Sequence, residues 1–249
     1  MISIGRGIRW YNDFENEVDF CINNDFDFMQ LWFKNGELLV DNIPEPKESY
    51  IKKIGFPVII HAVFELEDFK MYGNKLLDLS EYLGMNEVII HPVSETVTVN
   101  QNTAYLLAEQ SLAFSEQSKK RNIIWYLENN SIVDVFHCKK QDIEIVYQTD
   151  SYVEQLLDIA HVDSYKHLEE IISVKYPKCL HVAGKHFNVS HEHLPLVQGD
   201  IDYSFVFENY LKEYKGRIIL EIDADDKELL FSKKIIENAI SKCISKDRQ

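Results

Sequence analysis

Val-Ile-Ile-His at residues 58–61 and Val-Ile-Ile-His-Pro at residues 88–92 are two short stretches built on one pattern. Each is a continuous run of β-branched apolar residues that ends in a histidine. A continuous run, unlike an alternating one, is typical of a strand buried on both faces within a parallel sheet. The two stretches therefore predict parallel strands whose carboxyl ends carry polar side chains.

Similar apolar runs alternate with segments of helical periodicity along the chain. We expect strands over residues 2–8, 26–33, 57–64, 87–92, 122–128, 156–161, 179–183 and 217–222. We expect helices over residues 14–23, 46–54, 66–83, 103–120, 141–148, 165–175, 202–214 and 227–243. Eight βα units need about 250 residues. The chain of 249 residues therefore predicts an α/β fold, a single (β/α)8 TIM barrel over residues 1–249.

The composition is that of a globular protein, with 45% hydrophobic and 27% charged residues. No stretch approaches the 18 or so apolar residues of a membrane span, and the first residues lack the apolar core of a signal peptide. The four cysteines form no Cys-x-x-Cys pair; they are Cys21, Cys138, Cys179 and Cys243. We expect reduced thiols and a cytoplasmic location.

The charge balance restricts the partners of the chain. Lys and Arg number 26 and Asp and Glu number 41, which gives a net charge of −15. Duplex DNA requires a basic footprint, and long-range repulsion slows the encounter of two polyanions. The balance therefore argues against duplex DNA, while a local positive site made by metal ions stays compatible with it.

Polar residues of ligand type end six consecutive expected strands, and in this fold the carboxyl ends of the strands carry the chemistry. These residues are His61, His91, Glu128, Asp158, His181 and Glu221. His161 follows in the sixth strand, and His191 and His193 lie in the connection after the seventh. Converging carboxylates raise one another's pKa or require a cation. Salt bridges and hydrogen-bonded core histidines are the alternative, but six residues in register favour a site for Zn, Mn or Fe.

Three local patterns near these strand ends carry a family resemblance. Residues 157–161 read Leu-Asp-Ile-Ala-His, residues 193–202 read His-Leu-Pro-Leu-Val-Gln-Gly-Asp-Ile-Asp, and residues 216–222 read Gly-Arg-Ile-Ile-Leu-Glu-Ile. Together they resemble the xylose-isomerase-like TIM-barrel superfamily, which contains sugar phosphate isomerases and epimerases and the AP endonuclease family 2 proteins. The resemblance extends over residues 2–230 and implies the same barrel.

The resemblance also implies a ligand set, most fully that of the endonuclease-IV-type enzymes, which bind three metal ions. The matching positions are His61, His91, Glu128, Asp158, His161, His181, His193 and Glu221, and His191 stands where those enzymes carry Asp. Val197 replaces the first Gly of their Gly-x-Gly turn, and residues 129–132 lack the Gly-rich loop with which those nucleases hold DNA. The resemblance thus implies one to three divalent ions per chain.

The sugar isomerases and epimerases of the superfamily use a smaller set around one metal ion. Glu128, Asp158, His181 and Glu221 match it. In that resemblance Glu128 and Glu221 are the catalytic pair, one removing a proton from the substrate carbon and the other returning it.

Three functions follow, and they differ in their use of the metal. The first expectation is a metal-dependent isomerase or epimerase of a small sugar or sugar phosphate, because the charge and the short loops argue against DNA. The alternative is a multinuclear phosphoester hydrolase related to the AP endonucleases, because the nine ligand-type residues exceed what one metal ion uses. A metal-binding barrel without catalysis is the third. The oligomeric state is not predicted.

Overall fold

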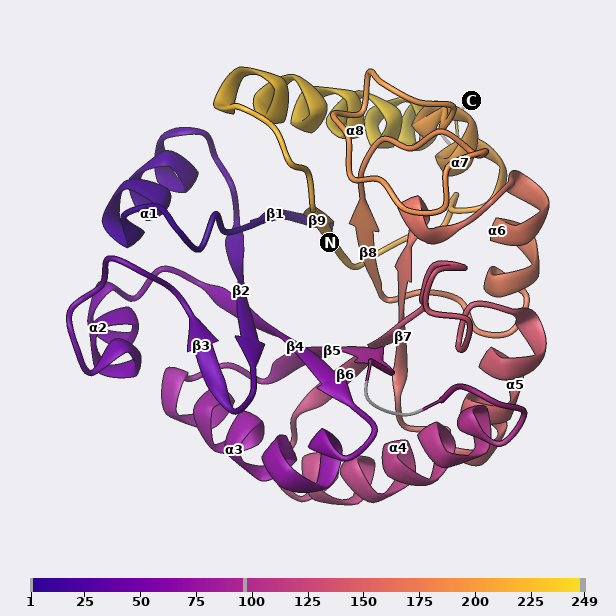
Figure 1. The fold of residues 1–249 in the computed structure, drawn as a ribbon. Helices are drawn as coiled ribbons and strands as arrows, with labels where there is room; N and C mark the ends of the chain where they lie inside the picture. The colour runs from indigo at the N-terminus through magenta and orange to yellow at the C-terminus, as the bar shows by residue number, and fades with distance from the viewer. Residues whose placement is uncertain (1, 96–97, 247–249) are drawn as a thin grey trace.

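Eight parallel strands close into a ring in the computed structural model, which describes residues 2–95 and 98–246 (Figure 1). In ring order they are β1 (Ser3–Gly7), β2 (Phe28–Lys34), β4 (Val58–Glu65), β5 (Glu87–Val93), β6 (Ile124–Glu128), β7 (Glu154–Asp158), β8 (Cys179–Val182) and β9 (Arg217–Leu220). Because β1 pairs in parallel with both β2 and β9, the ring has no open edge.

Helices surround the ring on the outside (Figure 1). They are α1 (Phe14–Asn23), α2 (Lys47–Ile54), α3 (Asp68–Leu83), α4 (Thr103–Lys120), α5 (Lys140–Thr149), α6 (Tyr165–Ile172), α7 (Tyr203–Asn209) and α8 (Asp226–Lys246). Gly55 and Gly84 end α2 and α3 with φ angles of 72° and 76°, as their positions predict. The predicted α/β fold, a (β/α)8 TIM barrel, is confirmed.

A short hairpin is the main addition to the predicted fold. β3 (Glu37–Leu39) pairs antiparallel with the end of β2. The turn between them is Asn35-Gly36, with φ angles of 53° and 81°, a sequence that favours tight hairpins because both residues tolerate positive φ. Three residues are too few for an apolar pattern to reveal the strand.

The sixth expected strand, residues 156–161, is shifted in the structure. β7 begins at Glu154 and ends at Asp158, and a 3-10 turn, η1 (Ile159–His161), follows. The Asp158 side chain causes the change, because its Oδ1 accepts a hydrogen bond of 2.7 Å from the backbone N–H of Ala160. The turn leaves His161 buried at the end of the barrel.

Two layers of inward side chains fill the barrel. The lower layer is an apolar cluster of Phe28, Ile59, Ile89, Tyr126, Leu156, Cys179 and Ile219. Two residues further along each strand lie Gln30, His61, His91, Glu128, Asp158, His181 and Glu221. Because side chains of a strand alternate between faces, residues two apart point the same way. The polar layer therefore rests directly on the apolar one.

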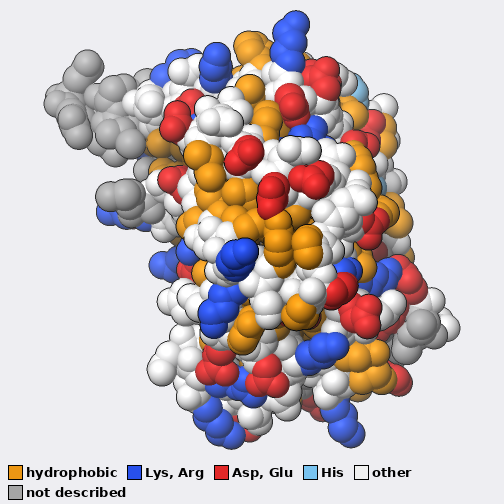
Figure 2. Space-filling model, turned by 90° about the vertical axis from the view of Figure 1, so that its left-hand side faces the viewer, with side chains coloured by type: hydrophobic (Ala, Val, Ile, Leu, Met, Phe, Trp, Pro, Cys, Tyr) orange, Lys and Arg blue, Asp and Glu red, His pale blue; other side chains and the backbone are white. Residues whose placement is uncertain are grey.

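The surface and the cysteines agree with the composition. Acidic and basic side chains are interspersed around apolar ones on the face drawn in Figure 2. All four cysteines are buried, and burial raises the pKa of Cys21 and Cys179 to about 12. Within residues 2–95 and 98–246, no helix has both the length and the apolar character needed to span a membrane.

Candidate metal centre

The structure brings all nine predicted ligands together at the carboxyl end of the barrel. They form four groups, in each of which one ligand atom per residue lies within 4.8 Å of the others. The first group is His61, His91 and Glu128; the central group is Glu128, Asp158, His181 and Glu221; the linking group is His61, His181 and Glu221; the triple-histidine group is His161, His191 and His193. Glu128 belongs to two groups, so the first and central groups are joined.

Glu128 lies at the middle of this arrangement and is only 1% exposed. Its Oε2 is 2.9 Å from His61 Nε2 and 3.3 Å from His91 Nδ1. Its Oε1 is 3.1 Å from His181 Nδ1 and 3.7 Å from His161 Nδ1. Each carboxylate oxygen therefore faces two imidazoles, which is the geometry of a carboxylate that bridges neighbouring ions.

The central group converges on one nitrogen of His181. Its Nδ1 lies 2.9 Å from Glu221 Oε2, 3.1 Å from Glu128 Oε1 and 3.7 Å from Asp158 Oδ2. The Asp158 and His181 side chains are fully buried, whereas Glu221 is 12% exposed. Glu221 is thus the carboxylate of the group that reaches the open side of the site.

Backbone carbonyls orient two rings of the triple-histidine group. His161 Nδ1 donates to the carbonyl of Asn129 at 2.8 Å, and His193 Nδ1 donates to the carbonyl of Glu221 at 2.8 Å. Since a carbonyl only accepts, each of these rings keeps its Nε2 free as a ligand. The loop that carries His191 and His193 is anchored by an antiparallel bridge between Gly184 and Leu194.

Several buried ligand atoms of these groups have no hydrogen-bond partner. They are both ring nitrogens of His61, His91 Nε2, Glu128 Oε2, Asp158 Oδ2 and His161 Nε2. Buried polar atoms are nearly always satisfied, because an unpaired one costs about 1–3 kcal/mol. Unpaired imidazole and carboxylate atoms that face one another suit a divalent ion, so the donor set fits the metal that the sequence predicts.

The buried carboxylates and imidazoles of the site shift one another's pKa values. Burial would raise the pKa of Glu128, but His91, His181 and His61 hold it well below its usual range. Burial would lower the pKa of His91, but the Glu128 carboxylate raises it to about 9. In the same way Glu221 and Glu128 raise the pKa of His181 well above its ordinary value. Without metal, protons on these histidines therefore supply the positive charge that the carboxylates require.

Residues that the sequence analysis did not select complete the surroundings. Gln30, fully buried in β2, contacts both His181 and Glu221. The Trp32 ring lies against the His61 ring at an interplanar angle of 32°, with centroids 4.6 Å apart. The sequence does contain a feature that could have identified Gln30 as part of the site. Gln30 follows Phe28 by two residues, the same spacing that separates Ile59 from His61.

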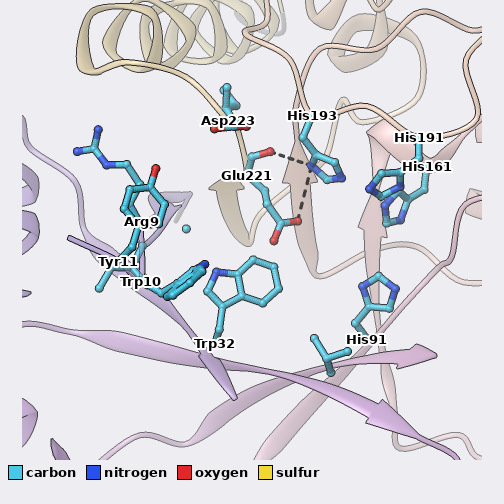
Figure 3. Close-up of a pocket in the computed structure, with 14 residues that line it drawn as sticks. Arg9, Trp10, Tyr11, Trp32, His91, His161, His191, His193, Glu221 and Asp223 are labelled. Atoms are coloured by element: carbon cyan, nitrogen blue, oxygen red, sulfur yellow. Dashed lines mark hydrogen bonds and ion pairs between the residues drawn. The ribbon is translucent and has the colours of Figure 1, made fainter. Parts of the chain in front are cut away.

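A pocket of about 470 Å³ opens over the groups. Figure 3 shows His91, His161, His191, His193 and Glu221 on one side, with Trp10 and Trp32 facing them and Arg9 and Tyr11 beyond the tryptophans. Arg9 forms ion pairs of 2.8 Å with Glu17 and 2.7 Å with Asp226, so its charge is neutralised. The pocket thus joins the candidate metal centre to an aromatic wall.

Replacing His191 and His193 together with alanine should remove one metal ion and leave the others bound. Both residues serve only the triple-histidine group, which shares no ligand with the other three. Elemental analysis of the zinc-loaded variant checks this. His186→Ala is the control, because His186 lies in the same loop but pairs with Glu192, outside the groups. Unchanged metal content in the double variant would contradict the assignment.

No family model and no curated protein matches the chain. Solved structures do match it. A D-tagatose 3-epimerase-like protein has a TM-score of 0.77 at 16% identity, with 98% of this chain and 99% of that chain covered. Endonuclease IV from Thermus thermophilus has a TM-score of 0.68 at 15% identity, with 96% of this chain and 99% of that chain covered.

A third similar structure is the IolI protein with a bound zinc atom, which has a TM-score of 0.68 at 13% identity, with 96% of this chain and 98% of that chain covered. A xylose isomerase domain protein from Salmonella typhimurium is also among the matches. The chain therefore has the fold of the xylose-isomerase-like TIM barrels, which sugar epimerases and endonuclease IV share.

Proposed function

We propose that this protein is a metal-dependent hydrolase that cleaves a phosphoester in a small substrate such as a sugar phosphate, at a centre of up to three divalent ions. The observation that carries the proposal is the set of four ligand groups, three of which share residues while the triple-histidine group stands apart. Sites with two or three neighbouring ions are typical of phosphoester hydrolysis, because the ions hold both the attacking and the leaving oxygen.

The burial of His61 favours this function over a centre with one metal ion. If only the central group bound metal, the remaining histidines would have to bind substrate. His61 is 0% exposed and lies under Trp32, so no substrate can reach it. Its two ring nitrogens, both unpaired, face Glu128 and Glu221 instead. An ion in the first group would give Nε2 a partner beside Glu128, and an ion in the linking group would give Nδ1 a partner beside Glu221.

The charge of the loaded site suits a phosphate. Glu128, Asp158 and Glu221 contribute about −3 and three divalent ions about +6, which leaves about +3. The ions would supply Lewis acidity and stabilise charge that develops on the phosphoryl oxygens. This local charge attracts a small anion in spite of the overall −15.

The protein's own residues have distinct tasks in the proposed reaction. Glu128 and Asp158, both buried, hold the ligand groups in register and away from competing water. Glu221 and the exposed His191 border the pocket, where substrate enters. Trp10 and Trp32 form the facing wall, against which the organic part of the substrate packs and which shields the reacting group from water.

The surroundings support a small substrate rather than a nucleic acid. The volume of about 470 Å³ accommodates a sugar phosphate. Arg9, the cationic side chain that lines the pocket, is committed to Glu17 and Asp226. The net charge of −15 would also repel a phosphate backbone at long range.

A sugar isomerase or epimerase is the second candidate function. It is favoured by the central group, whose four residues lie within ligand distance of one another, and by the similarity in fold to a D-tagatose 3-epimerase-like protein. In that reaction Glu128 and Glu221 would exchange the proton of the substrate carbon. The reaction requires one metal ion, in the central group.

One experiment separates the two functions. The protein is loaded with Zn or Mn without chelators, and its metal content is measured by elemental analysis. Phosphate release is then followed on a panel of sugar phosphates, and proton exchange at carbon is followed by NMR on ketoses in D2O. More than one ion per chain together with phosphate release supports the hydrolase. One ion with carbon-bound deuterium supports the epimerase. Bound metal without either activity leaves only a metal-binding barrel.

A further inference from the structure

Gln30 is a fully buried amide on β2 that touches two members of the central group. Its Nε2 donates to Glu221 Oε1 at 3.0 Å, and its Oε1 lies 2.8 Å from His181 Nε2. His181 lies on β8, 151 residues away in the chain, and Glu221 directly follows β9, 191 residues away. An amide that spans both is placed to set their orientation.

The chemistry of the partners determines which way each group points. An ionised carboxylate only accepts, so the Gln30 nitrogen must face Glu221. The Gln30 oxygen then faces His181, which makes Nε2 of that ring the protonated nitrogen. His181 Nδ1 is left toward Glu128, Asp158 and Glu221. One amide thereby defines both the ligating nitrogen of His181 and the position of the Glu221 carboxylate.

We propose that Gln30 is a positioning residue that presents His181 Nδ1 and the Glu221 carboxylate to one metal ion in the central group. The inference rests on the proposed function only in requiring that the central group binds metal. Outer partners that fix a ligating histidine commonly raise metal affinity about 10–100-fold. His181 and Glu221 occur together in the central and linking groups and in neither of the other two, so the effect belongs to the ion that these two residues would share.

The test compares Gln30→Met with wild type and with a matched control. Methionine fills the same volume but neither donates nor accepts strongly. Gln155→Met is the control, because Gln155 is also a buried glutamine in a barrel strand, on β7, and both its amide atoms lack partners. Zinc affinity is measured by stepwise competition with a chelator. We expect one ion to bind about 10–100-fold more weakly in Gln30→Met and all ions to bind normally in Gln155→Met.

A spectroscopic measurement distinguishes positioning from simple packing. In the zinc-loaded protein, ¹⁵N NMR should show His181 protonated at Nε2. Gln30→Glu keeps an acceptor for the proton on His181 Nε2. A carboxylate accepts more strongly than an amide, so the resonance of that proton should shift downfield. This variant also serves if Gln30→Met does not fold. An unchanged resonance in Gln30→Glu, or unchanged zinc affinity in Gln30→Met, overturns the proposal. A wild type that binds no metal in the central group would instead defeat the proposed function.

Discussion

Glu128→Gln should lose at least one metal ion and reduce phosphate release by about 10²–10³-fold or more. Glutamine keeps the shape of the side chain but replaces an anionic oxygen with a donor nitrogen. Glu128 belongs to both the first and the central group, so one substitution weakens both, whereas the linking group keeps all three of its ligands. The triple-histidine group shares no residue with Glu128 and should keep its ion. Elemental analysis of the loaded variant, alongside the activity, measures both effects.

Glu192→Gln is the matched control for this variant. Glu192 lies between His191 and His193 in sequence, but its carboxylate pairs with His186 and belongs to none of the four groups. It should leave metal content and activity unchanged. Full metal occupancy in Glu128→Gln would show that the buried carboxylate serves only as a counterion for histidines.

Removal of the metal ions should lower the melting temperature by about 5–10 °C for each ion present at a hundredfold excess over its dissociation constant. Such binding contributes about 2.7 kcal/mol, and 1 kcal/mol shifts the melting temperature of a chain of this size by about 2–4 °C. Thermal unfolding with and without a chelator measures the change. An unchanged melting temperature would mean that the folded chain binds no metal.

The same experiment has a pH dependence with a definite sign. Burial disfavours a charged His91, but Glu128 holds its pKa at about 9, above the unfolded value near 6.5. In the metal-free chain this contribution to stability is complete below pH 6.5 and is lost as the pH rises through 9. The metal-free protein should therefore lose stability between these values. Metal binding at pH 7 should release protons, because the ions replace those held by the histidines.

The barrel could be predicted because its signal is repeated eight times. Each continuous apolar run marks a strand, and glycines such as Gly55 and Gly84 mark helix ends through their backbone freedom. The β3 hairpin was missed because its pairing depends on Asn35-Gly36 rather than on apolar periodicity. The end of β7 was placed three residues late because apolar residues continue through the turn that Asp158 initiates.

The proximity of the nine ligand-type residues could be predicted from their positions at or after the ends of the expected strands. The carboxyl ends of parallel strands in one barrel all lie at the same rim. The division of these nine residues into four groups did not follow, because it depends on side-chain directions. The position of His161 is an example, since the 3-10 turn and the carbonyl of Asn129 set it. Gln30 was overlooked because an amide within an apolar strand resembles a chance polar residue until His181 and Glu221 are seen beside it.

Along each strand that contributes to both layers, the residue that stabilises the barrel core and the residue that carries the chemistry are different positions, two residues apart. Ile59 and Ile89 bury apolar surface, while His61 and His91, one step higher, are free to change without opening a cavity below them. A lineage can therefore exchange its reaction by substitutions in one layer while the other preserves the fold.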